Sequence, residues 1–290
     1  MTSSQLKEPP FTRIGLRTIT RRDGTFVYDN GAHFNAGKYS RFKHGDNEVA
    51  AAYAGEMADL LESQVLPQAN DAPVVVTASA YRLVPTAARS VAQMMYTVLL
   101  KRGHKIDAGR IHRPVLTNGD YAGMSEAERR LVMNSNGVYI DYDLFVRRHV
   151  VVIDDIRITG NHERSIVELF RDVPILSLTH TYVVQMDPDV AADPKVEEEL
   201  NQWWVKGLDQ LIELIVGDSE YTFNARTVKM ILEAASTDLT AFLRLLTNEQ
   251  LEQLYRGVIG DGYNRMSAYN GNFPYIREAM EARSLIARLI

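Results

Sequence analysis

The chain has 290 residues, more than one typical domain, and its 46% hydrophobic content is enough for a packed core. The absence of cysteine excludes a disulfide framework and any thiolate metal site. A net charge of -5 without a long basic run makes nucleic acid an unlikely main partner. No segment has the character of a signal peptide or the length of a membrane span, so we expect a cytoplasmic protein without a membrane partner.

The first 45 residues predict a hairpin followed by a flap. Residues 11–20 alternate like a strand, and the turn signal at 22–25 precedes a short second strand at 26–28. Residues 30–45 interleave aromatic with basic side chains. Such a segment can stack on a nucleobase or contact phosphate, or it can pack on the core as an irregular flap, and the sequence leaves both open.

Residues 46–186 alternate between strand and helix signals. This alternation predicts an α/β fold with a mainly parallel sheet flanked by helices. Asp46 is the expected N-cap of the first helix. The further elements are strands at 72–77, 104–116, 150–153 and 174–185 and helices at 85–101 and 163–170.

The character changes after Asp187, where prolines and acids interrupt the pattern and helical periodicity takes over. We therefore predict three regions: an N-terminal hairpin and flap at 1–45, an α/β core at 46–186, and a helical C-terminal addition at 187–290. The clearest helical patterns of the addition lie at 224–235, 239–246, 249–259 and 275–290.

One stretch combines features that chemistry can use. The β-branched run at 150–153 predicts a buried central strand, and Asp154 and Asp155 follow it directly. A turn at 159–161 then leads into a helix, whose N-terminal N–H groups can hold a phosphate, assisted by Arg157. Carboxylates at a strand end can accept hydrogen bonds from sugar hydroxyls and steer Mg²⁺. The pattern therefore indicates a sugar-phosphate site.

These residues resemble the phosphoribosyl pyrophosphate signature of type I phosphoribosyltransferases: an apolar strand, two acids, three variable residues, then Thr-Gly. The resemblance implies that Asp154 and Asp155 hold the ribose hydroxyls and, through water, Mg²⁺. It also implies a loop around the 5′-phosphate, formed by Arg157, Ile158, Thr159, Gly160, Asn161 and His162. Ile158 and His162 depart from the family pattern, which favours hydroxyl residues there. The alternative interpretation is an ordinary turn at a sheet edge, as in receiver domains.

Two further loops correspond to family elements. The loop after the 72–77 strand would receive pyrophosphate, although the family's glycine is missing; its residues are Ser79, Ala80, Tyr81 and Arg82. The long connection before the acidic strand resembles the family's mobile loop, which closes over the reacting centre. Its candidate contacts are Arg113, Tyr121, Arg129 and Arg130.

The resemblance implies a magnesium-dependent transferase that uses phosphoribosyl pyrophosphate and releases pyrophosphate. The acceptor is unidentified, no general base emerges, and a hood at 11–45 or in the helical third would select the acceptor. The expected partners are small-molecule substrates, with a homodimer as an option. A fainter resemblance, which includes residues 39–46, is to bacterial phosphoribosyltransferase-like proteins encoded with tellurite-resistance genes. A non-catalytic sensor of phosphoribosyl pyrophosphate or a nucleotide, and an α/β protein that binds no ribose phosphate, remain the alternatives.

Overall fold

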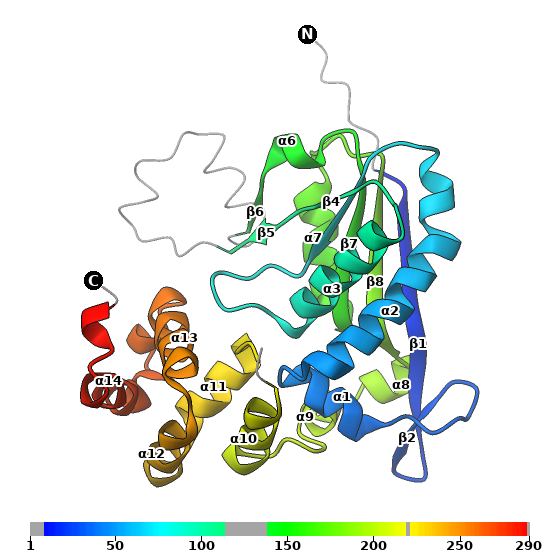
Figure 1. Cartoon of the computed structure of the whole chain (residues 1–290). Coiled ribbons are helices and arrows are strands. Elements are labelled where there is room, and N and C mark those ends of the chain that lie inside the picture. Colours follow the sequence, from blue (N-terminus) through cyan, green and yellow to red (C-terminus); the bar gives the residue numbers. More distant parts are fainter. Residues whose placement is uncertain (1–8, 114–137, 219–220, 289–290) are drawn as a thin grey trace. The chain divides into compact units, whose positions relative to one another are not determined.

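A computed structural model describes residues 9–113, 138–218 and 221–288 of the chain (Figure 1). The chain forms two compact units. The α/β unit comprises Met1–Phe34, Ala51–Tyr81 and Ala88–Val196, and the helical unit comprises Asn35–Ala50, Arg82–Ala87 and Glu197–Ile290. Segments 35–50 and 82–87 thus group with the C-terminal helices, although they are distant from them in sequence.

A six-stranded sheet forms the centre of the α/β unit, with strand order β2-β1-β8-β7-β3-β4. All neighbouring strands are parallel except β1 and β2, which form the antiparallel hairpin predicted from the sequence. The fold prediction of a mainly parallel α/β sheet is confirmed. The strands are β1 (Phe11–Arg22), β2 (Thr25–Tyr28), β3 (Val74–Ala78), β4 (Ile106–Ala108), β7 (His149–Arg157) and β8 (Ser177–Met186).

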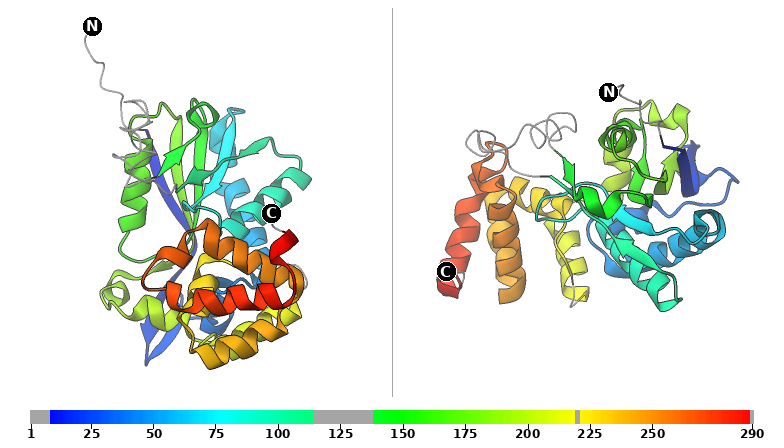
Figure 2. Two further views of the ribbon diagram at one scale, coloured as in Figure 1. Left: turned by 90° about the vertical axis from the view of Figure 1, so that its left-hand side faces the viewer. Right: turned by 90° about the horizontal axis from the view of Figure 1, so that it is seen from above.

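Helices cover both faces of this sheet, with α2 and α3 on one face and α7 on the other (Figure 2). Successive strand residues point to opposite faces. Val150 and Val152 therefore pack with Ile166 and Phe170 of α7 in one core cluster. The helices of this unit are α2 (Asn47–Gln64, from residue 51), η1 (Leu66–Ala69), α3 (Ala87–Lys101, from residue 88), α6 (Tyr142–Phe145), α7 (Asn161–Phe170) and α8 (Pro188–Ala191).

The strand predicted at 104–116 is wrong in its extent. The chain forms β4 in the main sheet and then β5 (Ile111–His112), which pairs with β6 (Tyr139–Ile140) in a separate two-stranded sheet. The break falls at Gly109, whose N–H donates to Val76 O at 2.8 Å. A Cβ atom at Gly109 would lie 2.7 Å from side-chain atoms of Phe145 and Val75, so the chain passes too close to the core for a side chain.

The helical unit packs its helices around a separate apolar core that includes Leu211, Ile231, Leu254 and Ile276. Its last long helix ends at Ala282 rather than near the C-terminus as predicted, and Ser284 follows in a left-handed conformation with φ 54°. Its elements are α1 (Ala36–Lys43), α9 (Val196–Asn201, from residue 197), α10 (Leu208–Gly217), α11 (Ala225–Glu233), α12 (Ser236–Leu245), α13 (Asn248–Gly260), η2 (Tyr263–Arg265), η3 (Asn270–Asn272), α14 (Phe273–Ala282) and η4 (Ile286–Arg288).

The aromatic side chains of the predicted flap are buried. Phe34, Tyr39 and Phe42 expose 2%, 0% and 1% of their surface, so they pack as core residues and present no stacking platform. Asp46 caps the following helix as predicted, because its Oδ1 accepts the N–H of Val49 at 3.0 Å. Within the described part of the chain, no helix is both long and apolar enough to cross a membrane.

Candidate active site

The strand order has its switch point at the carboxyl ends of β3 and β7. These strands are neighbours, but β3 leads to β4 on one side and β7 leads to β8 on the other. Parallel α/β sheets bind ligands where the strand order reverses in this way, outside the carboxyl ends of the strands. The acidic pair and the loop after β3 both belong to this edge of the sheet.

The acidic pair lies within β7 rather than after it. Pairing with β3 stops at Ile153, as expected, but pairing with β8 continues through Asp154 to Arg157. The two carboxylates are therefore held by a strand that is paired on one side only. Pairing with β8 gives the acids a more rigid support than a loop would, because their backbone remains part of the sheet.

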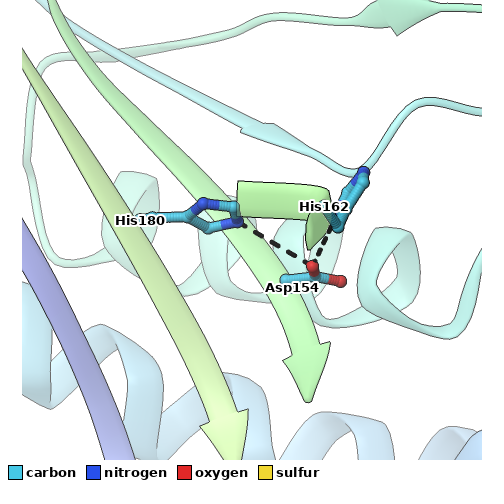
Figure 3. Close-up of side chains that lie close together, drawn as sticks. All are labelled: Asp154, His162 and His180. Carbon is cyan, nitrogen blue, oxygen red and sulfur yellow. Dashed lines mark hydrogen bonds and ion pairs between the residues drawn. The ribbon is translucent and has the colours of Figure 1, made fainter. Parts of the chain in front are cut away.

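Asp154 is buried and bonded on both carboxylate oxygens. Its Oδ1 accepts the Ser79 hydroxyl at 2.7 Å, and its Oδ2 lies 2.7 Å from His162 Nδ1. The Nε2 atom of His180 lies 3.8 Å from the same Oδ2 (Figure 3). Burial alone would raise the pKa of Asp154, but the hydrogen bond and charge of His162 outweigh it and lower the pKa to about 2.

His162 lies in the first turn of α7 and links the two acids electrostatically. Burial opposes its charged form, but the bond to Asp154 and the nearby charges of Asp154 and Asp155 raise its pKa above the ordinary value. The half-buried Asp155 accepts the N–H of Ile156 at 2.8 Å. The carboxylates of both acids thus lie near the same imidazole.

His180 projects from β8, opposite Val152 in the register of the sheet. Its side chain is fully buried, and within the described residues neither ring nitrogen has a hydrogen-bond partner. Burial lowers its pKa to about 4. A buried polar group without a partner costs about 1–3 kcal/mol, so this position needs a reason.

The turn from β7 to α7 has the conformation that a phosphate loop requires. Gly160 precedes the helix with φ 72° and ψ 13°, a left-handed conformation that favours glycine. A Cβ atom here would lie 3.1 Å from Arg157 Nη2, so the position is also crowded. Among the residues that the structure describes, no side-chain hydrogen bond caps α7, and the N–H groups of a helix's first turn can bind an anion.

Arg157 lies beside this turn, but its charge is shared with a carboxylate. Its Nε is 3.4 Å from Glu163 Oε2, and Arg13 also binds Glu163 through two nitrogens. The Tyr182 hydroxyl donates to the same carboxylate at 3.0 Å. Burial raises the pKa of Glu163, but the hydrogen bonds from Arg13 and Tyr182 and the arginine charges lower it overall.

The loop predicted to bind pyrophosphate divides between the two units. Ser79, Ala80 and Tyr81 belong to the α/β unit, whereas Arg82 groups with the helical unit. Ser79 and Ala80 are buried, and Tyr81 is half-buried with the Arg110 guanidinium 4.3 Å from its ring centre. In the helical unit, Arg82 lies beside Gly262: its Nη1 is 3.3 Å from the position of a Cβ there.

Of the predicted mobile-loop contacts, only Arg113 belongs to the described residues. Its side chain is exposed, and its N–H donates to Tyr81 O at 3.2 Å, which joins this segment to the predicted pyrophosphate loop. Tyr121, Arg129 and Arg130 lie outside the described residues.

Sequence reasoning missed three residues of this region: Arg13, Glu163 and His180. His180 left a signal, because it is an ionisable residue in the middle of a strand that is otherwise apolar or neutral. The sequence contains no signal for Arg13 and Glu163, because each is an ordinary charged residue by its position in the chain. Only the folded structure brings β1 and α7 close enough for the two side chains to bond.

Comparison with known proteins agrees with the class that the fold defines, an α/β protein with a mainly parallel sheet. Residues 25–276 match a profile described as PRTase ComF-like. The chain belongs to the ComF-like family of type I phosphoribosyltransferases and is an enzyme of the pentosyltransferase class.

Among solved structures, a hypoxanthine phosphoribosyltransferase from Staphylococcus aureus matches with 18% identity and a TM-score of 0.30. The match covers 50% of this chain and 76% of the other, and a likeness this low adds nothing to the family assignment. No curated protein sequence matches the chain.

Proposed function

We propose that this phosphoribosyltransferase uses phosphoribosyl pyrophosphate as its donor and a nucleobase-like or other small molecule as its acceptor. The observation that carries the proposal is the sequence of Asp154, Asp155 and a left-handed Gly160 leading into an uncapped helix, all at the switch point of the sheet. The acids suit the hydroxyls of a ribose, and the turn suits its phosphate. A ribose 5-phosphate has both groups in one molecule.

The roles of the residues follow from their chemistry. We assign the 5′-phosphate to the N–H groups of the turn residues 159–162 and to the Thr159 hydroxyl. We assign the ribose hydroxyls to Asp155 directly and to Asp154 after exchange of one partner, because both Asp154 oxygens already accept hydrogen bonds. Within the α/β unit, we assign the pyrophosphate to Ser79, Ala80 and Tyr81, the residues that follow β3.

The reaction breaks the bond between ribose C1 and a pyrophosphate oxygen and forms a bond from C1 to the acceptor, which loses a proton. Positive charge develops on the ribose ring as pyrophosphate departs. Carboxylates near the ring stabilise this charge, which is the contribution we assign to Asp154 and Asp155.

Magnesium fits this site through Asp155. A half-buried carboxylate at the strand edge supplies the oxygen donor that Mg²⁺ prefers, with water completing the shell. When bound with the donor, the ion would neutralise the leaving pyrophosphate. Asp154 is the poorer candidate of the two predicted metal-site acids, since its oxygens are bonded to Ser79 and His162.

A second function has specific support. A sensor that binds phosphoribosyl pyrophosphate without turnover would explain why Asp154 is already satisfied and why the loop at 79–82 contains no glycine. The cytoplasmic setting, the tellurite-resistance context and the homodimer stay predictions.

Two measurements test the proposal. Calorimetric titration with phosphoribosyl pyrophosphate and Mg²⁺ should show binding, and Asp155→Asn should weaken it at least tenfold. The matched control is Asp143→Asn, an exposed acid in α6, which immediately precedes β7. Pyrophosphate release with a panel of bases then separates enzyme from sensor. Absence of binding by the wild type would refute both functions, and binding without release for every acceptor would favour the sensor.

A further inference from the structure

The buried imidazole of His180 has no role in the proposed phosphoribosyl transfer. It points at Asp154 from β8, while His162 points at the same carboxylate from α7 (Figure 3). The bond between His162 and Asp154 explains the position of His162. His180, in contrast, is fully buried and has no hydrogen-bond partner among the described residues.

The three side chains have the spacing of a metal site. One ligand atom from each lies within 4.8 Å of the other two. Among the described residues, these three side chains are the group close enough together to hold a metal ion. Asp154 Oδ2 is 2.7 Å from His162 Nδ1 and 3.8 Å from His180 Nε2. Bonds of about 2.0–2.1 Å to a tetrahedral ion place its ligand atoms about 3.3 Å apart, between those two distances.

The surroundings hold the ligands in place. The Ser79 hydroxyl donates to the second Asp154 oxygen at 2.7 Å, which orients the carboxylate in the way that outer partners of metal ligands do. The ring of His180 stacks on Tyr182, with 4.7 Å between ring centroids. Two of the three ligands also come from neighbouring strands of one sheet, so they need little rearrangement.

We infer that Asp154, His162 and His180 bind a divalent transition-metal ion of the zinc type. Two imidazole nitrogens and one carboxylate form a donor set that suits zinc and its neighbours, whereas magnesium prefers oxygen ligands in an octahedral shell. Three protein ligands leave a coordination position for water or for an oxygen of a substrate. This ion is separate from the magnesium assigned to Asp155 and needs no donor substrate in order to bind.

The test is metal binding by the metal-depleted full chain, without phosphoribosyl pyrophosphate. Competition with a chromophoric zinc chelator should give one tight site per chain, and added Zn²⁺ should raise the melting temperature. Cobalt substitution should give the strong visible absorption of a four-coordinate ion. His162→Gln should weaken zinc binding at least tenfold, and because this side chain is 39% exposed, the variant should fold.

The matched control is His104→Gln, which removes another imidazole paired with a carboxylate, at 2.6 Å from Glu62. It should leave zinc affinity unchanged, and His180→Gln should behave like His162→Gln. Equal zinc affinity in the wild type and His162→Gln would overturn the inference, as would displacement of zinc by an equal concentration of Mg²⁺. Because the test omits the donor, failure here leaves the transferase proposal standing, and failed donor binding leaves the metal site standing.

Discussion

The two units bury polar side chains in different ways. In the helical unit, Ser40 and Asn224 bond mainly to the backbone: Ser40 donates to Asn201 O, and Asn224 caps α11 while donating to Lys43 O. In the α/β unit, Asp154 and Glu163 bond to other ionisable side chains, His162 and Arg13. Bonds to the backbone fix a chain path, whereas clusters of ionisable side chains at a sheet edge supply charge for chemistry.

The contrast teaches where to look for function in this chain. The helical unit has capping boxes at α11 and α13 around an apolar core, but it also buries His44, whose Nε2 has no hydrogen-bond partner among the described residues. In the α/β unit, the buried carboxylates of Asp154 and Glu163 are paired with His162 and Arg13. The buried His180 imidazole has no hydrogen-bond partner among the described residues.

The buried histidine of the helical unit should make that unit acid-sensitive. Burial lowers the pKa of His44 to about 4, with only partial compensation from the Ser40 carbonyl and further opposition from Arg226 and Lys43. The unfolded chain therefore binds a proton first as the pH falls from about 6.5 to about 4. Stability should be complete above that range and fall by up to about 3 kcal/mol across it.

Denaturant unfolding of wild type and His44→Gln at both ends of this pH range measures the effect. The variant should lack this part of the acid slope, whereas contributions from all other groups are common to both proteins and cancel. Parallel slopes would mean that His44 does not titrate as its burial implies, and that ionisable groups in the helical unit are not a cost.

The carboxylate cluster of the α/β unit should be costly to break. Glu163→Gln removes the charge that Arg13 and Arg157 share, and we expect a loss of about 2 kcal/mol of unfolding free energy. Glu168→Gln on the same helix removes an exposed pair with Arg171 and should cost less than about 0.5 kcal/mol. Equal losses in chemical denaturation would show that the buried cluster has no special weight.

Substitutions at Gly160 and Gly103 distinguish an effect of backbone strain from an effect on donor binding. Gly160→Ala places a side chain at φ 72° beside Arg157, and Gly103→Ala imposes similar strain at φ 90° with no atom within 4 Å. Each should cost about 1 kcal/mol of stability. Only Gly160→Ala should weaken donor binding, by about tenfold or 1.4 kcal/mol, because it narrows the proposed phosphate turn. Calorimetry on both variants checks this, and equal donor affinity would remove the turn from the site.

The helical unit supplies the smallest effect. Asn224→Ala removes the capping box of α11 and a bond to Lys43 O, and should cost about 1 kcal/mol of stability. The affinity for phosphoribosyl pyrophosphate should stay unchanged, because the Asn224 cap stabilises the backbone of the helical unit and has no assigned role in donor binding. A drop in calorimetric affinity for the donor would contradict the assignment of a purely structural role to these backbone-directed bonds.

Much of the fold could be predicted because its signals are local. The run at 150–153 is too short and too rich in β-branched residues for a helix, and the turn at Gly160 indicates the start of the helix that follows. The break at Gly109 could not be predicted, because its cause is the proximity of Phe145 and Val75, which only the folded core creates.

The candidate site shows the same limit. Asp154, Asp155 and the phosphate turn are contiguous in sequence, so a motif identifies them. The partners of Asp154 come from the residue after β3, from α7 and from β8, and the register of the sheet, not sequence spacing, brings Ser79 and His180 to the same carboxylate. Continued pairing with β8 also explains why the strand extends past the acids.

The central claim is that the acids of β7 hold a ribose while the turn before α7 holds its phosphate. A crystal structure with phosphoribosyl pyrophosphate and Mg²⁺ tests it most directly. We predict ribose hydroxyls within hydrogen-bonding distance of the Asp155 and Asp154 carboxylates and the 5′-phosphate against the N–H groups of residues 159–162. A donor bound away from the carboxyl end of β7, or with its phosphate away from Gly160, would contradict the account.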